Sequence, residues 1–534
     1  MNTTTTQQHE PIQASTWYIT TSIPYVNAQP HIGHALELIQ ADTLARYYRL
    51  TGATVRLQSG TDENALKNVQ AAERAGVATA ALVEQNAQQF YALQGRLGLA
   101  LDDFIRTSVD ERHRFGVEKL WRACAANGDI YKQPYRGLYC VGCELFYTEE
   151  ELVDGCCPVH ATVPDIVEEE NYFFRLSRYG DRLHALIERD QLRIVPESRK
   201  NEVLSFIRRG LHDFSISRSQ LRAKGWGIRV PDDPSGVIYV WFDALVNYIT
   251  GPGYATNAAE YQRFWAGAGE RLHVIGKDIT RFHAIYWPAM LLSAGLPLPT
   301  TILVHGFITI NGDKISKSKG NVIDPVALVE AYGTDALRYY LLRKVPTTGD
   351  ANFTLDEFVL TYNADLADQL GNLVQRVVKM VERYCGRQVP TPGALNALDQ
   401  ALVATAVATQ EVVDIAMAEF ALHRAIEAVR ELVVAANKYV VDVAPWTVAK
   451  GAAQGSADAQ TTLDTTLYVL LETVRLIGHY LAPFLPDTAT AIAKQLGLGE
   501  AEANQPWASA LRWGQLASGA ALPPAQPLFP KLPA

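Results

Sequence analysis

The segment Trp17-Tyr18-Ile19-Thr20-Thr21 predicts a buried strand, and His31-Ile32-Gly33-His34 opens a helix-periodic run that follows it. Val55-Arg56-Leu57-Gln58-Ser59 then predicts a second strand. This order of strand, helix and strand is typical of a parallel, doubly wound α/β sheet, which is the predicted fold class. Because ligands of such sheets bind beyond the carboxyl ends of strands, His31 and His34 are predicted to lie at a ligand site.

The sheet is predicted in two halves that are separated by residues 129–226, where short strands, glycines and a cysteine cluster indicate a small insertion. The second half is predicted to contain strands at residues 237–241, 272–276 and 301–304. Four segments that follow strands should therefore converge at one edge of the sheet. These segments are residues 22–34, 60–62, 276–283 and 305–307.

With 534 residues the chain is too long for one compact core, so three or four domains are expected. Its formal net charge of −9 argues against a surface that coats nucleic acid, although a local basic face still binds phosphates. No uncharged apolar run reaches the roughly 20 residues of a membrane span. The polar start, residues 1–15, lacks a signal-peptide pattern, so we expect a disordered tail on a cytoplasmic protein with no membrane partner.

Two short segments are candidates for binding a phosphorylated ligand. A helix N-terminus favours phosphate, His31 and His34 share its first turn, and Gly33 removes a side chain where a ligand approaches the backbone. Lys314 and Lys317 lie in a glycine-flanked loop, where mobile lysines suit a group that closes over pyrophosphate and releases it. Taken alone, such histidines are more often capping or core residues, and such lysines more often form a solvated loop.

Four of the six cysteines lie within residues 140–157, which favours a metal site over disulfides in a chain without secretory signals. Cys140 and Cys143, with Cys157 and His160, give a C-x₂-C and C-x₂-H spacing that is typical of a closed, structural Zn²⁺ site. We expect one zinc ion per chain. Whether Cys156 replaces its neighbour as a ligand stays open.

Together, residues 31–34 and the segment Lys314-Ile315-Ser316-Lys317-Ser318 resemble the paired signatures of class I aminoacyl-tRNA synthetases. The lysine-containing segment corresponds to the second signature. Ile315 stands where that signature more often has Met. The resemblance narrows to the methionyl-tRNA synthetase family and covers nearly the whole chain. It is carried by residues 22–27, 60–63, 239–244, 276–283 and 305–307.

The resemblance implies ATP-dependent attachment of L-methionine to methionine and initiator tRNA through a methionyl-adenylate. It implies an ATP-binding set of His31, Gly33, His34, Lys314, Ser316 and Lys317. The two histidines would act on the α- and β-phosphates and the two lysines on pyrophosphate, with Mg²⁺ arriving on ATP. The amino-acid carboxylate is already a nucleophile, so catalysis is expected to be positioning plus electrostatic stabilisation.

By the same resemblance, one set of residues would bind methionine: Ile23, Tyr25, Asp62, Trp241, Tyr248, Ile279, Phe282 and His283. Aromatic edges suit a thioether, and a partly buried ammonium needs a carboxylate, which is the implied role of Asp62. Two positions depart from the family pattern. Asn64-Ala65 replaces the His-Gly often found after Asp-Glu, and Leu245 stands where some relatives have Pro.

After about residue 361, helix-spaced apolar residues recur at residues 366–383, 398–417, 422–441 and 463–481. They predict a helical bundle. There Asn372, Arg376 and Trp446 resemble the family's anticodon readers, since unpaired bases are read by stacking and by hydrogen bonds to their edges. No domain that dimerises some relatives follows, so we expect a monomer.

The predicted organisation combines these parts in order along the chain. It consists of a tail at residues 1–15, a Rossmann-like catalytic first half at 16–128, a zinc-binding insertion at 129–226, a second catalytic half at 227–305, a signature-loop and stem-contact region at 306–360, an anticodon-binding bundle at 361–517 and a strap at 518–534. The alternatives left open are another class I synthetase, a non-catalytic tRNA-binding paralogue and a nucleotidylyltransferase.

Overall fold

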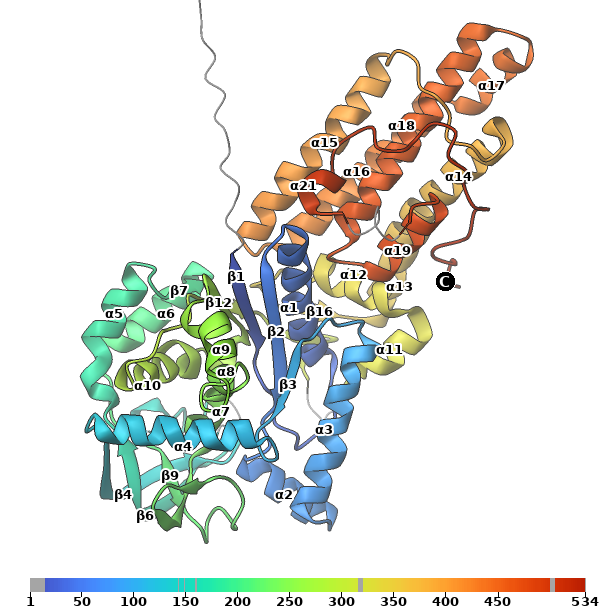
Figure 1. Ribbon diagram of the computed structural model, residues 1–534. Coiled ribbons are helices and arrows are strands. Elements are labelled where there is room, and N and C mark those ends of the chain that lie inside the picture. Colours follow the sequence, from blue (N-terminus) through green and yellow to red (C-terminus); the bar gives the residue numbers. More distant parts are fainter. Residues whose placement is uncertain are drawn as a thin grey trace, which may run out of the picture.

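A computed structural model of the chain describes residues 15–142, 144–147, 149–158, 161–315, 320–499 and 505–533. Figure 1 shows a central twisted sheet, a smaller β-rich part beside its lower end, and a long helical bundle that leans away from the upper end. A parallel sheet in a mixed α/β architecture, followed by a helical C-terminal part, confirms the predicted fold class.

The central sheet has six strands, and every neighbouring pair runs parallel. In spatial order they are β3 (Asp103–Arg106), β2 (Thr54–Thr61), β1 (Thr16–Thr21), β12 (Glu270–Gly276), β13 (Thr301–His305) and β7 (Arg193–Val195). The strand β1 lies between β2 and β12, so the chain winds outward in both directions from it. Such a reversal opens a crevice at the carboxyl ends of the strands.

Alternate strand residues enter two separate cores, as the period of two in a strand requires. Ile19, Leu272 and Leu303 pack with α1 (Ile32–Leu50) and α3 (Thr79–Arg96) on one face. Tyr18, Ile302 and Val304 pack with α4 (Glu111–Ala126) and α10 (Trp287–Ser293) on the other. Both faces are therefore covered, which is why apolar residues of the strands point to both sides of the sheet.

The strands between residues 129 and 226 belong to three sheets. Four of them form an antiparallel sheet: β5 (Leu145–Tyr147), β4 (Ile130–Cys140), β6 (Asp165–Phe174) and β8 (Phe214–Ser215). The helices α5 (Gly180–Glu188) and α6 (Glu197–Arg208) flank β7, which adds an edge strand to the central sheet beside β13.

The strand predicted at residues 237–241 is wrong in its second half. The strand β11 (Asp233–Ile238) ends at Ile238, in a three-stranded sheet with β9 (Ser217–Ser219) and β10 (Arg229–Val230). The helix α7 (Val240–Leu245) then begins. The apolar, aromatic composition favoured a strand, but tertiary packing decides the conformation of so short a segment.

The region between the sheet and the bundle is built from short elements. They are β14 (Ile308–Ile310), β15 (Asp313–Lys314), α11 (Pro325–Tyr332), α12 (Thr334–Lys344), β16 (Ala351–Phe353) and α13 (Leu355–Thr361). The strand β14 pairs with β15 and β16 in a small sheet.

The four helices predicted for the C-terminal part are confirmed. The part comprises a π-helical turn (Tyr362–Gly371), α14 (Asn372–Cys385), α15 (Ala397–Ala418), α16 (Leu422–Val443), α17 (Pro445–Ala453), α18 (Ala457–Leu481), α19 (Pro486–Gln495) and α21 (Trp507–Ala510). Among the described helices, α15 alone has the length and apolar composition of a membrane span, and it packs here against α16 and α18. The last described residues run irregularly, as expected for the strap.

A buried ion pair joins the sheet domain to the bundle. Asp42 on α1 and Arg338 on α12 both have fully buried side chains, 2.8 Å apart. Arg338 Nε also donates to the carbonyl of Phe484, at the turn between α18 and α19, at 2.7 Å. A third bond runs from Arg338 Nη1 to the carbonyl of Leu97, after α3. One guanidinium thus connects four segments that are distant in sequence.

Arg338→Ala should lower the free energy of unfolding by about 3–5 kcal/mol, because Asp42 and two buried carbonyls lose their shared partner. Arg96→Ala is the matched control, since it breaks an ion pair with Glu330 whose side chains are 54% and 60% exposed. It should cost less than about 1 kcal/mol. Denaturant unfolding followed by circular dichroism measures both variants, and equal losses would contradict the structural role of Arg338.

Candidate active site

The N-terminus of α1 is shaped by the histidines of the first signature. His31 caps the helix: its Nδ1 accepts the Gly33 N–H at 3.1 Å, while the His31 N–H donates to His34 Nδ1 at 3.1 Å. The two rings stack with centroids 3.8 Å apart. A Cβ on Gly33 would lie 3.0 Å from His31 Cε1, so a larger residue would disturb the cap.

These bonds fix the tautomers of both rings, because a ring nitrogen that accepts carries no proton. The proton of each neutral imidazole is then on Nε2. Burial, and then the neighbouring His31, lower the pKa of His34 well below its ordinary value, so His34 is neutral near pH 7. The capping interpretation is therefore correct as local structure, and each ring still has an Nε2–H donor.

The second signature approaches this helix end through Ile315. A Cβ on Gly33 would stand 3.9 Å from Ile315 Cδ1, and the Ile32 N–H donates to the carbonyl of Ile323 at 3.0 Å. Ile315, within the second signature, and Ile323, shortly after it, thus both lie against the first signature. Ser316 and Lys317 lie outside the described residues, as does the side chain of Lys314, whose backbone belongs to β15.

Buried polar groups line the crevice next to His34. Glu37, one turn further along α1, accepts from Ser22 Oγ at 2.6 Å and pairs with His305 Nε2 at 2.8 Å. Burial opposes a charge on His305, but the Glu37 carboxylate raises the pKa of His305 above its ordinary value. No role was assigned to Glu37 or His305 from the sequence. The place of His305 at the end of a predicted strand was the feature that could have indicated a role for it.

A second group of side chains forms an aromatic pocket beside the first. Trp241 and Phe282 stack with centroids 3.6 Å apart, and Tyr25 meets Trp241 edge to face at 6.3 Å. Tyr248 OH bonds His283 Nε2 at 2.6 Å, and His283 Nδ1 bonds the carbonyl of Ile279 at 2.9 Å. Burial lowers the pKa of His283 to about 4, so this imidazole is neutral.

Two polar atoms of this pocket lack a partner. Tyr25 OH and Trp241 Nε1 are buried, yet neither has a hydrogen bond among the described residues. A buried polar group without a partner is costly and often marks a ligand position.

Ile23 and Ile279 are half-buried. Five of the eight residues predicted for the methionine pocket belong to or pack against one apolar core: Tyr25, Trp241, Tyr248, Ile279 and Phe282.

Asp62 follows β2 and lies beside Tyr25, with which it forms an isolated parallel bridge. Its exposed fraction is 2%. Burial, and then the nearby Asp243 carboxylate, raise the pKa of Asp62 well above its ordinary value, and the Asn64 backbone N–H partly opposes this. A cation delivered to this place would restore the charged form of Asp62.

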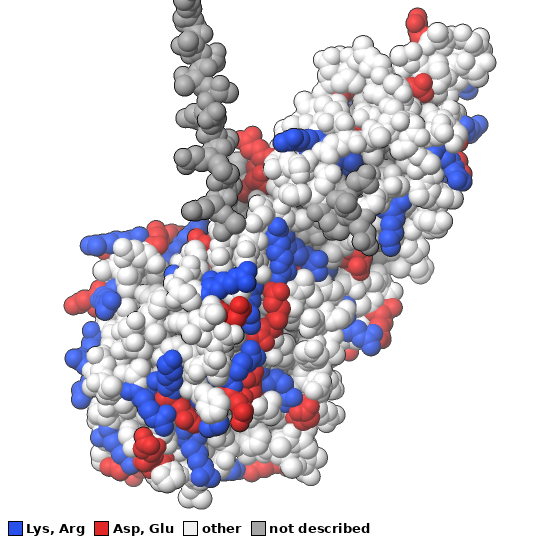
Figure 2. Space-filling model, viewed as in Figure 1, with Lys and Arg blue, Asp and Glu red and all other residues white. Residues whose placement is uncertain are grey.

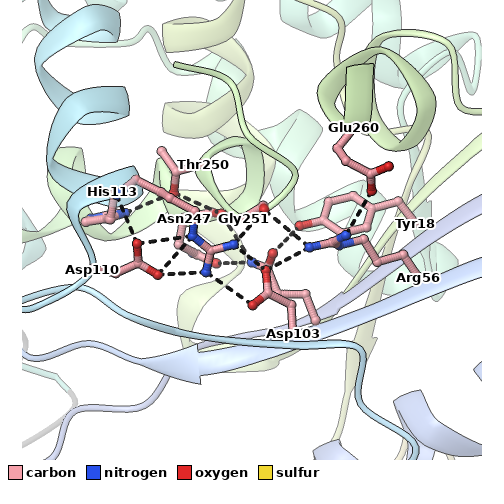
Figure 3. A network of polar contacts seen from close by, with 11 residues as sticks. Tyr18, Arg56, Asp103, Asp110, His113, Asn247, Thr250, Gly251 and Glu260 are labelled. Atoms are coloured by element: carbon pink, nitrogen blue, oxygen red, sulfur yellow. Dashed lines mark hydrogen bonds and ion pairs between the residues drawn. The ribbon is translucent and has the colours of Figure 1, made fainter. Parts of the chain in front are cut away.

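An extended polar network supports the far side of the pocket (Figure 3). Tyr18 OH donates to Gln58 at 2.6 Å, and Gln58 Nε2 in turn donates to the side chain of Asn247 at 3.1 Å. Arg56 pairs with Asp103 at 2.9 Å on one edge of the network. These bonds tie β1, β2 and β3 to α8 (Asn247–Thr250), which carries Tyr248.

A buried salt bridge links the small antiparallel sheet to the pocket. Glu144 Oε2 lies 2.6 Å from Arg218 Nη2, and Glu144 Oε1 accepts the Lys67 N–H at 3.1 Å. The Lys67 ammonium sits 4.6 Å from the ring centre of Tyr25. Burial alone would favour neutral Glu144, but Arg218 holds the pKa of Glu144 below its ordinary value. Neither Glu144 nor Arg218 was singled out from the sequence.

Two of the four predicted zinc ligands are described and lie in one cluster. Cys140 and Cys157 are 2% and 1% exposed and pack with Tyr147. The Ala161 N–H donates to the carbonyl of Cys157 at 2.8 Å, which closes a tight turn. Cys143 and His160 lie outside the described residues, and the described part of the chain holds no group of three or more metal-binding side chains.

The three predicted anticodon readers stand on two elements of the bundle. Asn372 and Arg376 share one face of α14, where Asn372 is exposed. Trp446 follows the left-handed Ala444 at the start of α17 and is 43% exposed. On the face drawn in Figure 2, charged side chains are dense over the sheet domain and sparse over the bundle.

Comparisons with known proteins agree with this geometry. The chain matches the model of class I tRNA synthetases of the methionine type over residues 17–163 and 150–378. Residues 389–534 match the model of the anticodon binding domain of methionyl tRNA ligase. Together the two models cover most of the chain.

Individual relatives match over nearly their full length. The methionine–tRNA ligases of Brucella melitensis and Mycobacterium tuberculosis are each 44% identical to this chain, over 96% of it and 98% of the relative. The structure of M. tuberculosis methionyl-tRNA synthetase in complex with methionyl-adenylate superposes with a TM-score of 0.91 at 44% identity, covering 97% of this chain and 100% of that one. The chain belongs to the methionyl-tRNA synthetase family.

Proposed function

We propose that this chain carries out the reaction of its family, the ATP-dependent attachment of L-methionine to tRNA through a methionyl-adenylate, with the residues assigned below. The observation that carries the proposal is the meeting of the two signatures at Gly33 and Ile315, beside the pocket of Tyr25, Trp241 and Phe282. An ATP site and an apolar amino-acid site would then share one crevice. Amino-acid-dependent ATP–pyrophosphate exchange across the twenty amino acids tests it, and methionine alone should support exchange.

We assign the phosphate side of the reaction to His31, His34, Lys314 and Lys317, with Gly33 and Ser316 completing the ATP site. Nε2–H groups on these two rings suit phosphate oxygens because they donate hydrogen bonds, and His34 is neutral because burial lowers its pKa. Charge builds on the leaving pyrophosphate, where lysine ammoniums stabilise the transition state. Mg²⁺ would arrive on ATP and needs few protein ligands.

We assign the amino-acid side to Asp62 and the aromatic pocket. Asp62 would hold the substrate ammonium, since its buried carboxylate has a raised pKa and no ion pair with any described residue. The faces and edges of Trp241, Phe282 and Tyr25 would surround the thioether, with Ile23, Tyr248, Ile279 and His283 completing the wall. A charged side chain would be rejected here, because His283 is neutral and the walls are apolar.

Lys317→Ala should reduce the rate of methionine-dependent pyrophosphate exchange by a factor on the order of 10²–10³, because the lysine charge that stabilises the leaving pyrophosphate is lost. The affinity for free methionine, measured by isothermal titration calorimetry, should stay nearly unchanged. Lys319→Ala is the matched control in the same loop. An exchange rate equal to that of the unaltered enzyme would remove Lys317 from the mechanism.

We propose that Cys140, Cys143, Cys157 and His160 hold one structural Zn²⁺. Two buried thiols in one cluster, one of them opening a tight turn, fit such a site. Zinc would supply folding energy to the antiparallel sheet and take no part in the chemistry.

Elemental analysis of the native protein should find one zinc per chain, and Cys140→Ala should lose it and lower the melting temperature. Cys385→Ala, which alters a half-buried cysteine of the bundle, should keep the metal. Native protein without stoichiometric zinc would refute the site.

We propose that Asn372, Arg376 and Trp446 read the anticodon of methionine and initiator tRNA. The exposed indole of Trp446 supports stacking as its mode of recognition. Such a protein needs only one chain for each site named here, so we further propose a monomer. We also propose that it works in the cytoplasm, where its proposed substrates ATP and tRNA are found.

Trp446→Ala should raise the Michaelis constant for tRNA by on the order of tenfold, because stacking is worth about 1–3 kcal/mol per base. Methionine activation should be spared. Val441→Ala, which trims another exposed apolar side chain of the bundle, should change neither step. Equal losses of activation and aminoacylation in Trp446→Ala would contradict anticodon reading.

A further inference from the structure

Two buried carboxylates lie near each other at the polar end of the methionine pocket. Asp62 and Asp243 are 2% and 0% exposed, and each would repel the charge of the other. Asp243 has hydrogen-bond partners at both of its carboxylate oxygens. Asp243 Oδ1 bonds His113 Nε2 at 2.5 Å, and Asp243 Oδ2 accepts from Asn64 Nδ2 at 2.7 Å.

His113 is itself held in place from its other side. It is fully buried, and its Nδ1 lies 3.1 Å from Thr250 Oγ1, which donates onward to the carbonyl of Asn247 (Figure 3). The two oxygens of Asp243 are thus occupied by His113, on α4, and by Asn64, which follows β2. Asp243 is thereby removed as a competitor for a ligand cation.

Asn64 touches both carboxylates by different atoms. Its side-chain amide donates to Asp243, and the same nitrogen lies 3.3 Å from the carbonyl of Thr107. Its backbone N–H points to Asp62 Oδ1 at 3.3 Å, a long bond that leaves Asp62 available to a better donor. Asn64 therefore holds Asp243 through its side chain and contacts Asp62 through its own backbone.

We propose that Asn64 is a positioning residue for the substrate ammonium, which aims Asp62 into the pocket while its amide holds Asp243 in the hydrogen-bond chain to His113. The inference deepens the proposed function and rests on the ammonium role of Asp62. A neutral amide suits this place, because it satisfies Asp243 without bringing a positive charge that would repel the ligand.

Two thioether alcohols that differ only by an amino group give a direct test. L-methioninol carries the ammonium, and 4-(methylthio)butan-1-ol lacks it. Binding of each to the full-length protein is measured by quenching of tryptophan fluorescence at pH 8. Asn64→Ala should weaken the affinity for L-methioninol by about tenfold, the typical effect of losing a hydrogen bond to a charged group. The affinity for the amino-free alcohol should change by less than about twofold.

Asn64→His should restore most of the preference, since a neutral imidazole at pH 8 again offers an N–H to Asp243. Asn68→Ala is the matched control for loss of a buried amide, because Asn68 donates to the backbone carbonyls of residues 62 and 63 and to neither carboxylate. It should lower the melting temperature without changing the preference for the amino group.

Asp62→Ala separates failure of the inference from failure of the proposed function. If Asp62→Ala keeps the preference for L-methioninol, the ammonium role of Asp62 is wrong. If Asp62→Ala loses the preference but Asn64→Ala weakens both alcohols equally, or neither, the role of Asn64 is overturned. In the double variant the loss should equal that of Asp62→Ala alone, because the two residues act on one interaction.

Discussion

The place of β1 between β2 and β12 is the constraint on which the rest of the molecule depends. Because all three strands are parallel, the segments that leave their carboxyl ends enter one crevice. The first signature follows β1, Asp62 follows β2, and the segment with Phe282 and His283 follows β12. Side chains as distant in the sequence as Tyr25 and His283 thus meet without any loop having to cross the sheet.

The buried charges show a consistent division between structure and ligand binding. Arg338 with Asp42, Arg218 with Glu144 and Arg475 with Glu472 are buried pairs, each with further hydrogen bonds. Such pairs are costly to break because one partner would be left as an isolated buried charge. Asp62 is the contrasting case, since its pKa is raised and its counter-charge would come from the substrate.

The sequence anticipated the parts of the site that depend on local pattern. The capping arrangement of His31 and His34 follows from their place after a strand and before an apolar helix, and the structure has both bonds of that cap. The four bundle helices followed from apolar spacing alone. The segment 237–241 failed because its composition fits either conformation, and packing of Trp241 on Phe282 accompanies a helix there.

The sequence by itself determined the parallel sheet and the helical C-terminal part, because these are properties of spacing and residue type within short segments. The signatures and the aromatic residues of the pocket were implied by the resemblance to the family. Only the tertiary structure decided that Glu37 pairs with His305, that Glu144 pairs with Arg218, and that Asn64 stands between Asp62 and Asp243. Such contacts join residues 74 to 268 positions apart or depend on which side chains share a buried volume, and no local periodicity encodes that.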